Sequence, residues 1–117
     1  MSINAYKQMS KMIDEIVLLL ESDFLKVVSQ PTRLRILYFL RKGEKCACEI
    51  IPEMGEDQSN ISRHLNHLKD AGILDSRREG VSVYYRIKDK RVFDLLNLVD
   101  EIIRTQVKEK ARTVKVI

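Results

Sequence analysis

Residues 57–68 restrict the possible folds of this chain more than any other segment. The spacing of their apolar side chains predicts a helix with one apolar and one polar face. The apolar face holds Ile61, Leu65 and Leu68. The opposite face holds Ser59, Arg63 and Asn66, with Ser62 at its flank. A basic segment, Arg77 to Gly80, follows. A helix that exposes short hydrogen-bonding side chains and an arginine, followed by a basic hairpin, is typical of a protein that reads DNA.

Apolar spacing predicts three helices before residue 43. An amphipathic helix is expected over residues 3–21, and Ser22-Asp23 offers an N-cap for a short second helix over residues 24–29. Pro31 suits the first turn of a third helix, which is densely apolar and ends at Gly43.

A helix-turn-helix is expected next in the chain. A short helix over residues 47–54 contains Pro52, which should weaken or bend it. Gly55 closes this helix, and the two-faced helix begins directly afterwards. Two helices joined by a short turn, the second with a polar outer face, form a helix-turn-helix over residues 47–71.

Residues 81–87 alternate between apolar and polar side chains, as a half-buried strand does. Residues 73–74 supply the opposing strand, and Arg78 to Gly80 supply the turn, since Gly80 can take a positive φ. The sequence thus predicts a two-stranded β-wing over residues 73–87. Arg77 and Arg78 are expected at its tip, where they could meet phosphate or the minor groove. A charged tip that only keeps the hairpin in solution is the alternative.

The last expected helix, residues 89–110, is apolar around nearly its whole circumference. Such a helix needs a second surface in addition to its own core, and another subunit could supply it. With 117 residues, the chain is expected to form one domain. We predict a mostly α fold with a two-stranded β-wing, a winged helix-turn-helix that dimerises through residues 1–22 and 89–110.

The composition excludes fewer possible functions than the order of polar and apolar residues does. The net charge of +4 suits a polyanionic partner, but a solvated basic surface fits equally well. No apolar run approaches the roughly 18 residues of a membrane span, and the Met1 end lacks the features of a secretion signal. We therefore expect a cytoplasmic protein with reduced cysteines and no membrane partner. An enzyme is not expected, because no catalytic triad, phosphate-binding glycine loop or paired-carboxylate cleft is visible.

The residues expected to contact bases are Gln58, Ser59, Ser62 and Arg63. Small hydroxyls and amides can approach base edges, and an arginine can make a bidentate contact to guanine. The helix N-terminus favours phosphate. For an isolated helix, a plain solvent-facing surface is the stronger interpretation. The order of helix, turn, polar-faced helix and basic hairpin favours DNA.

Several segments agree, in order, with one known family. They are Gln30–Leu37, Gln58–Leu65, Gly72–Leu74 and Gly80–Ile87. Together they resemble the ArsR/SmtB family of winged-helix repressors over roughly residues 24–88. The resemblance implies a homodimer with the first and last helices at the interface. It also implies a pseudo-palindromic double-stranded operator, no required cofactor, and an inducer, most often a metal or metalloid ion, that releases the DNA.

Cys46 and Cys48 are the only cysteines and stand at the start of the helix that precedes the DNA-reading helix. Residues two apart on a regular helix point about 200° away from each other, so the two can share an ion only if the backbone is frayed or extended. Lys42, Lys45 and the helix N-terminus favour thiolates, the form that binds soft ions.

The resembled family places Cys-x-Cys here in sensors of arsenite and antimonite or of cadmium and lead. This chain keeps the spacing, with Glu49 beside it, but Ile51 stands where a third cysteine often occurs, and residues 1–25 contain none. Two thiolates still suit a trivalent metalloid that carries an exogenous thiol. Cys46 and Cys48 are therefore candidate ligands of arsenite, antimonite or a soft divalent metal ion. Thiol redox sensing and inert packing are the alternatives.

The histidines are weaker candidates for metal binding. His64 is expected to pack or form hydrogen bonds beside the helix interface, and His67 to lie on the surface. Residues 89–117 contain no histidine, so their acidic side chains are expected to form a solvated edge.

These observations predict a homodimeric, sequence-specific transcriptional repressor released from its operator by a soft ion at Cys46 and Cys48. One alternative is a repressor of the same fold that responds to thiol oxidation. The other is a winged-helix module that binds protein instead of DNA.

Overall fold

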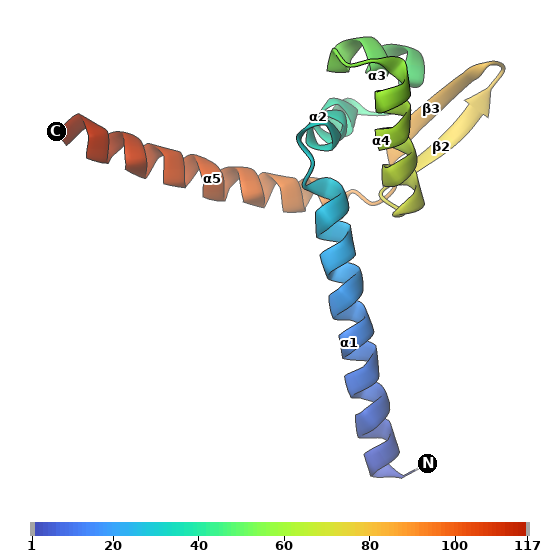
Figure 1. The fold of residues 1–117 in the computed structure, drawn as a ribbon, viewed down its shortest axis with the longest axis vertical. Helices are drawn as coiled ribbons and strands as arrows, with labels where there is room; N and C mark the ends of the chain where they lie inside the picture. Colours follow the sequence, from blue (N-terminus) through green and yellow to red (C-terminus); the bar gives the residue numbers. More distant parts are fainter. Residues whose placement is uncertain (1, 117) are drawn as a thin grey trace.

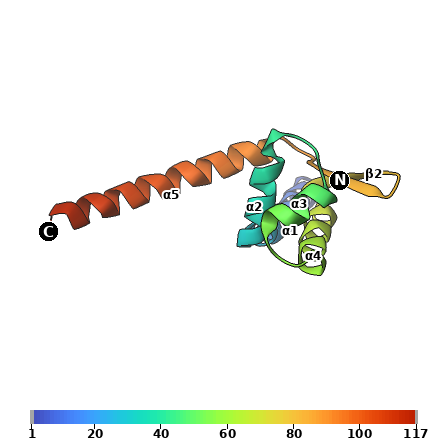
Figure 2. The ribbon, with the colours of Figure 1, turned by 90° about the horizontal axis from the view of Figure 1, so that it is seen from above.

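The computed structural model describes residues 2–116 as a small helical body with two long projecting helices (Figure 1). The elements are α1 (Ile3–Val28), α2 (Pro31–Phe39), the 3₁₀-helix η1 (Leu40–Lys42), β1 (Lys45–Cys46), α3 (Ala47–Met54), α4 (Gln58–Asp70), β2 (Leu74–Glu79), β3 (Ser82–Ile87) and α5 (Arg91–Val116). The radius of gyration is 19.2 Å, whereas a compact chain of this length has about 13 Å. The difference reflects α1 and α5, which extend away from the body in different directions (Figures 1 and 2).

α1 is one continuous helix, so the predicted break at Ser22-Asp23 is wrong. No glycine or proline lies between residues 3 and 28, and serine or aspartate inside a helix costs only roughly 0.5 kcal/mol each. The helix begins at Ser2, whose side chain accepts a hydrogen bond from the Ala5 amide. It ends before Pro31, because the residue preceding a proline favours extended backbone.

The core lies where α2, α3, α4 and the inner end of the sheet meet. Its fully buried side chains are Ile36, Leu37, Leu40, Ile50, Ile61, Leu65, Leu68, Ile73 and Leu74. Val92 and Leu96 add the first turns of α5 to it. Three of these residues, Ile61, Leu65 and Leu68, form the apolar face predicted for residues 57–68, so this prediction is confirmed.

The sheet has three antiparallel strands in the order β1-β3-β2, one more than predicted. β1 pairs its two residues with Tyr85 and Tyr84 of β3. β2 continues to Glu79, so the turn consists of Gly80 and Val81. Gly80 has a φ of 61°, which a two-residue hairpin turn requires at its first position.

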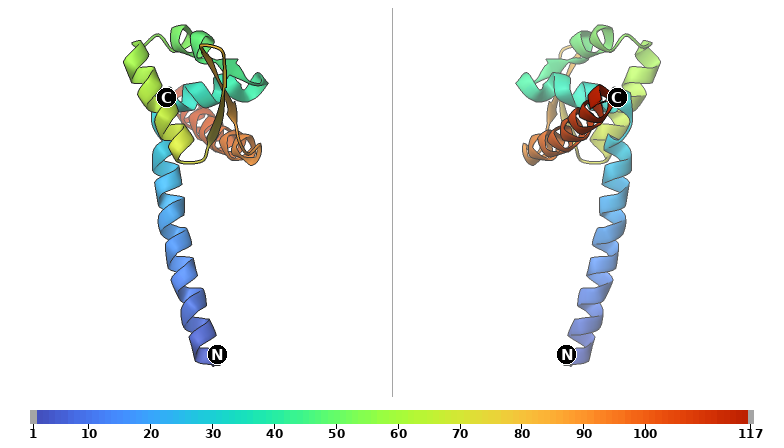
Figure 3. Two further views of the ribbon diagram at one scale, coloured as in Figure 1. Left: turned by 90° about the vertical axis from the view of Figure 1, so that its right-hand side faces the viewer. Right: turned by 90° about the vertical axis from the view of Figure 1, so that its left-hand side faces the viewer.

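The projecting helices carry long rows of exposed apolar side chains. On α1 they include Tyr6, Met9, Met12, Ile13, Ile16, Val17, Leu19, Leu20 and Leu25. On α5 they include Leu98, Val99, Ile102, Ile103 and Val107. Within residues 2–116, no helix is both long and apolar enough to cross a membrane. Figure 3 shows how far α1 stands clear of the body.

Candidate nucleic-acid interface and cysteine pair

α4 presents the predicted DNA-reading residues on the accessible surface of its first turns. Asp57 caps the helix, because its carboxylate accepts hydrogen bonds from the Asn60 amide at 2.8 Å and from the Ser59 hydroxyl at 3.1 Å. Ser59 and Arg63 lie on the side opposite the buried residues, Ser62 lies at the flank of that side, and Gln58 lies in the first turn of the helix. All four are exposed except Ser62, which is half-buried. The side chains expected to contact bases are therefore accessible together, while the opposite face holds the helix in the core.

The Glu56 carboxylate links the turn before α4 to α2 through polar contacts. One carboxylate oxygen accepts a hydrogen bond from the Thr32 hydroxyl and lies 3.7 Å from Arg35. The other accepts one from the Asn60 side chain at 2.8 Å. Thr32 is buried, so this polar contact lies at the edge of the core. This contact could not be predicted from the sequence, because nothing in the local pattern distinguishes a glutamate in a turn that binds another helix from one that faces solvent.

His64 is buried on the inner side of α4, as expected, and His67 is exposed. The Nε of Arg33 donates a hydrogen bond to Nδ1 of His64 at 3.0 Å, and Nη1 of Arg33 donates to the Val27 carbonyl at 3.2 Å. Burial lowers the pKa of His64 below its usual value, and the positive charge of Arg33 lowers it further. His64 is thus held as a neutral hydrogen-bond acceptor that links α4, through Arg33, to the end of α1.

The two predicted wing arginines lie inside β2 rather than at the tip of the hairpin. The tip is the Gly80-Val81 turn, because β2 is longer than the sequence indicated. Both arginine side chains are exposed, and Arg77 forms ion pairs with Glu44 and Glu79. α4 packs against β2, and the hairpin of β2 and β3 projects beside α4 (Figure 1).

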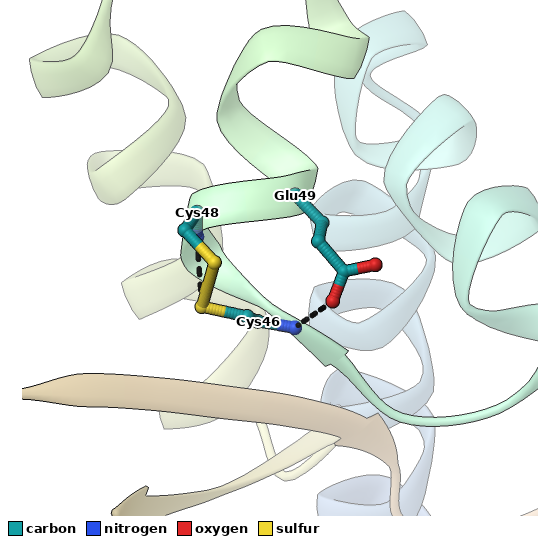
Figure 4. Close-up of a disulfide and its surroundings, with 3 residues drawn as sticks. All are labelled: Cys46, Cys48 and Glu49. Atoms are coloured by element: carbon teal, nitrogen blue, oxygen red, sulfur yellow. Dashed lines mark hydrogen bonds between the residues drawn. A yellow bond between two sulfur atoms is a disulfide. The ribbon is translucent and has the colours of Figure 1, made fainter. Parts of the chain in front are cut away.

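Cys46 and Cys48 lie side by side at the start of α3 (Figure 4). Cys46 is the N-cap residue, with extended backbone at φ −70° and ψ 146°, and so stands outside the regular helix. Extended backbone at this position is the condition under which the two sulfurs can meet. The structure joins them as a disulfide, in contrast to the reduced thiols that we expected. Cys46 is buried, at 3% exposure, and Cys48 is exposed.

The surroundings of the cysteine pair supply few further candidate metal ligands. The carboxylate of Glu49 accepts a hydrogen bond from the Cys46 amide at 3.3 Å, and the Cys48 amide donates to the Cys46 sulfur at 3.1 Å. Among residues 2–116, no three histidine, cysteine, aspartate or glutamate side chains are grouped as a metal site would need. The two sulfurs, once reduced, fit a soft ion that accepts two protein ligands, and a further ligand would have to come from solution or a second subunit.

An antiparallel hairpin that follows a helix-turn-helix, with α4 packed beside it, defines a winged helix-turn-helix, a class of DNA-binding regulators. Residues 30–76 match the model of the arsR family of bacterial regulatory proteins. The chain belongs to this ArsR family, whose members are transcriptional regulators and not enzymes.

Three relatives illustrate the membership. The chain is 45% identical to an HTH-type transcriptional regulator of Methanocaldococcus jannaschii over 69% of its own length and 92% of the relative. It is 32% identical to the arsenical resistance operon repressor of Escherichia coli over 82% of each chain. Its fold matches a homodimeric winged helix-turn-helix DNA-binding domain of Mycobacterium bovis with a TM-score of 0.75 and 29% identity, covering 82% of this chain and 89% of that one.

Proposed function

We propose that this chain is a cytoplasmic, homodimeric repressor that binds a pseudo-palindromic DNA operator through α4 and the wing. A soft metal or metalloid ion that binds Cys46 and Cys48 would release it. The observation that carries the proposal is the accessible surface of the first turns of α4, which carries Gln58, Ser59, Ser62 and Arg63, while Ile61, Leu65 and Leu68 bury the helix in the core. Arg63 supplies the bidentate contact that guanine accepts, and the smaller side chains approach neighbouring bases.

The unpartnered apolar rows on α1 and α5 support the dimer. A hollow of about 460 Å³ lies where α1 approaches the start of α5, lined by Val17, Leu20, Glu21, Phe24, Leu25 and Leu95. Exposed apolar surface on this scale needs a partner, and the related M. bovis domain is homodimeric. A two-fold dimer places its two α4 helices in successive major grooves, about one helical turn apart.

The position of the cysteine pair supports its role as the sensor. Cys46 and Cys48 begin α3, which a single short turn joins to α4. An ion held by both sulfurs would fix the N-cap residue of α3. The resulting shift of α3 would change how α3 holds the DNA-reading helix, α4. One relative is named for arsenical resistance, and arsenite prefers thiolate ligands. An exogenous thiol would complete a three-coordinate metalloid.

A thiol-redox switch is the second candidate, and the Cys46–Cys48 disulfide favours it. Oxidation removes two electrons and two protons from the thiol pair and forms the sulfur–sulfur bond, with a disulfide or a peroxide as the acceptor. This candidate requires no third ligand. Counting free thiols in the denatured protein, purified without reductant, tests whether the pair is oxidised in cells.

Salt dependence tests the DNA-binding function. A protein with several phosphate contacts loses roughly 10³-fold or more in affinity for duplex DNA between 50 and 200 mM salt. We expect that loss for the wild type, and weaker binding by Arg63→Ala at every salt concentration. Binding that ignores salt and is unchanged in Arg63→Ala would instead indicate a module that binds protein.

A further inference from the structure

The guanidinium of Arg77 is exposed but bound by two carboxylates of the protein. Its Nε donates to both carboxylate oxygens of Glu44, at 3.0 and 3.1 Å, and its Nη2 donates to one of them at 2.7 Å. Nη1 donates to Glu79 at 2.9 Å. The same group lies 4.5 Å from the ring centroid of Tyr84. Two carboxylates therefore neutralise this cation, and a ring covers one side of it.

These contacts cross all three strands of the sheet. Tyr84 on β3 is paired with Cys46 of β1 on one side and with Arg77 of β2 on the other. Glu44, which binds Arg77, immediately precedes β1. Cys46, Tyr84 and Arg77 thus form one row across the sheet, and the Glu44–Arg77 ion pair links the two edge strands beside that row.

Arg78 is placed differently from its neighbour. Side chains alternate along a strand, so Arg78 points to the opposite face of β2 from Arg77. Within residues 2–116, its exposed side chain forms no ion pair or hydrogen bond. Both wing arginines are exposed, but within residues 2–116 only Arg78 has a guanidinium that no carboxylate of the protein binds.

We propose that Arg77 is a positioning residue that, with Glu44, clamps the wing to the segment carrying Cys46, while Arg78 makes the wing's contact with DNA. The proposal rests on the DNA-binding function proposed above and revises the role that the sequence suggested for Arg77. A bidentate arginine–carboxylate pair fixes geometry even where its net contribution to stability is small. The clamp gives a change at the cysteine pair a second route to DNA, through β1 and the wing, in addition to the route through α4.

The decisive variant is Glu44→Gln. Its DNA affinity should rise if Glu44 acts only through its charge, and should fall if Glu44 holds the wing in place. Removing a negative charge near DNA should strengthen binding if Glu44 acts only through its charge. If Glu44 holds the wing, the variant should bind a labelled duplex, recovered by in vitro selection with the wild type, about three- to tenfold more weakly. Glu53→Gln is the matched control, since Glu53 is exposed on α3 and belongs to no ion pair within residues 2–116. It should bind as tightly as the wild type or more tightly.

Arg77→Lys and Arg78→Ala complete the test. Arg77→Lys keeps the charge but loses the bidentate geometry, so it should weaken binding as Glu44→Gln does, with the salt slope of the wild type. Arg78→Ala should reduce the slope of log K against log salt by about 0.9, the value for one lost phosphate contact. Thermal melts of each variant identify any loss of folding.

Wild-type affinity in Glu44→Gln, or in Arg77→Lys, would overturn the clamp and leave the DNA-binding function intact. A slope reduced by about 0.9 in Arg77→Ala would also overturn it, because Arg77 would then contact phosphate itself. If the wild type binds no duplex DNA, both the clamp's role and the proposed function fail.

Discussion

The Nε of Arg33 lies 3.0 Å from Nδ1 of His64 and donates a hydrogen bond to it, which joins α2 to α4. Because Arg33 also binds the Val27 carbonyl at the end of α1, one side chain connects α1 with α4. In a dimer that uses α1 at its interface, this connection would help to set the distance between the two DNA-reading helices.

Acid should destabilise the fold through His64. The folded-state pKa of His64 lies below the ordinary value of 6.5, so the unfolded chain binds this proton more readily. The free energy of unfolding should therefore be highest above pH 6.5 and fall as the pH drops below it. Melting temperatures measured from about pH 7.5 to pH 5.5, at one protein concentration, should show this loss.

The variant His64→Gln removes the titrating group and keeps a side chain that can accept from Arg33. Its melting temperature should change less over the same pH range than that of the wild type. His67→Gln is the control, since His67 is exposed, and should keep the wild-type dependence. An equal pH dependence in the wild type and His64→Gln would contradict the role of His64.

Leu65 should be essential for the stability of α4. It is 1% exposed and packs into the core shared by α2, α3 and α4. Leu65→Ala should lower the free energy of unfolding by about 2–5 kcal/mol in urea titrations. Asn66→Ala, on the exposed face of the same helix, should change it by no more than about 0.5 kcal/mol. Similar losses in the two variants would contradict the assignment of the two faces.

A charge on the apolar row of α5 should break the dimer. Ile102 is 49% exposed in the single chain, and its burial against a second copy would leave a substituted carboxylate without water. Ile102→Glu should sediment as a monomer at concentrations where the wild type sediments as a dimer. Glu101→Gln, at the next position of the helix, is the control and should remain dimeric. A dimeric Ile102→Glu would place the interface elsewhere.

The helix-turn-helix could be predicted from the sequence because its signals are local. The period of the apolar side chains sets the two faces of α4, and Asp57 and Gly55 mark where the helices begin and end. The break expected at Ser22-Asp23 shows the limit of such signals, since an N-cap residue is also tolerated inside a long helix.

The missing features depend on contacts distant in sequence. β1 has two residues, too few to show any alternation, and exists because β3 offers a free edge. The Glu44–Arg77 pair joins residues 33 positions apart, and only the strand register brings them together. For the cysteines, the sequence defined the condition for a shared site, extended backbone at Cys46, but could not show that the N-cap position meets it.

Operator release by the cysteine pair is the most direct test of the regulatory mechanism. The measurement is the affinity of the reduced protein for its selected duplex, by fluorescence anisotropy, with and without arsenite, cadmium and a disulfide oxidant. We expect at least one of these agents to weaken binding by tenfold or more, about 1.4 kcal/mol. The Cys46→Ser/Cys48→Ser variant should bind DNA as the wild type does and respond to none of them. Wild-type binding that ignores all three, or release that persists in the double variant, would contradict the assignment of Cys46 and Cys48 as the sensor.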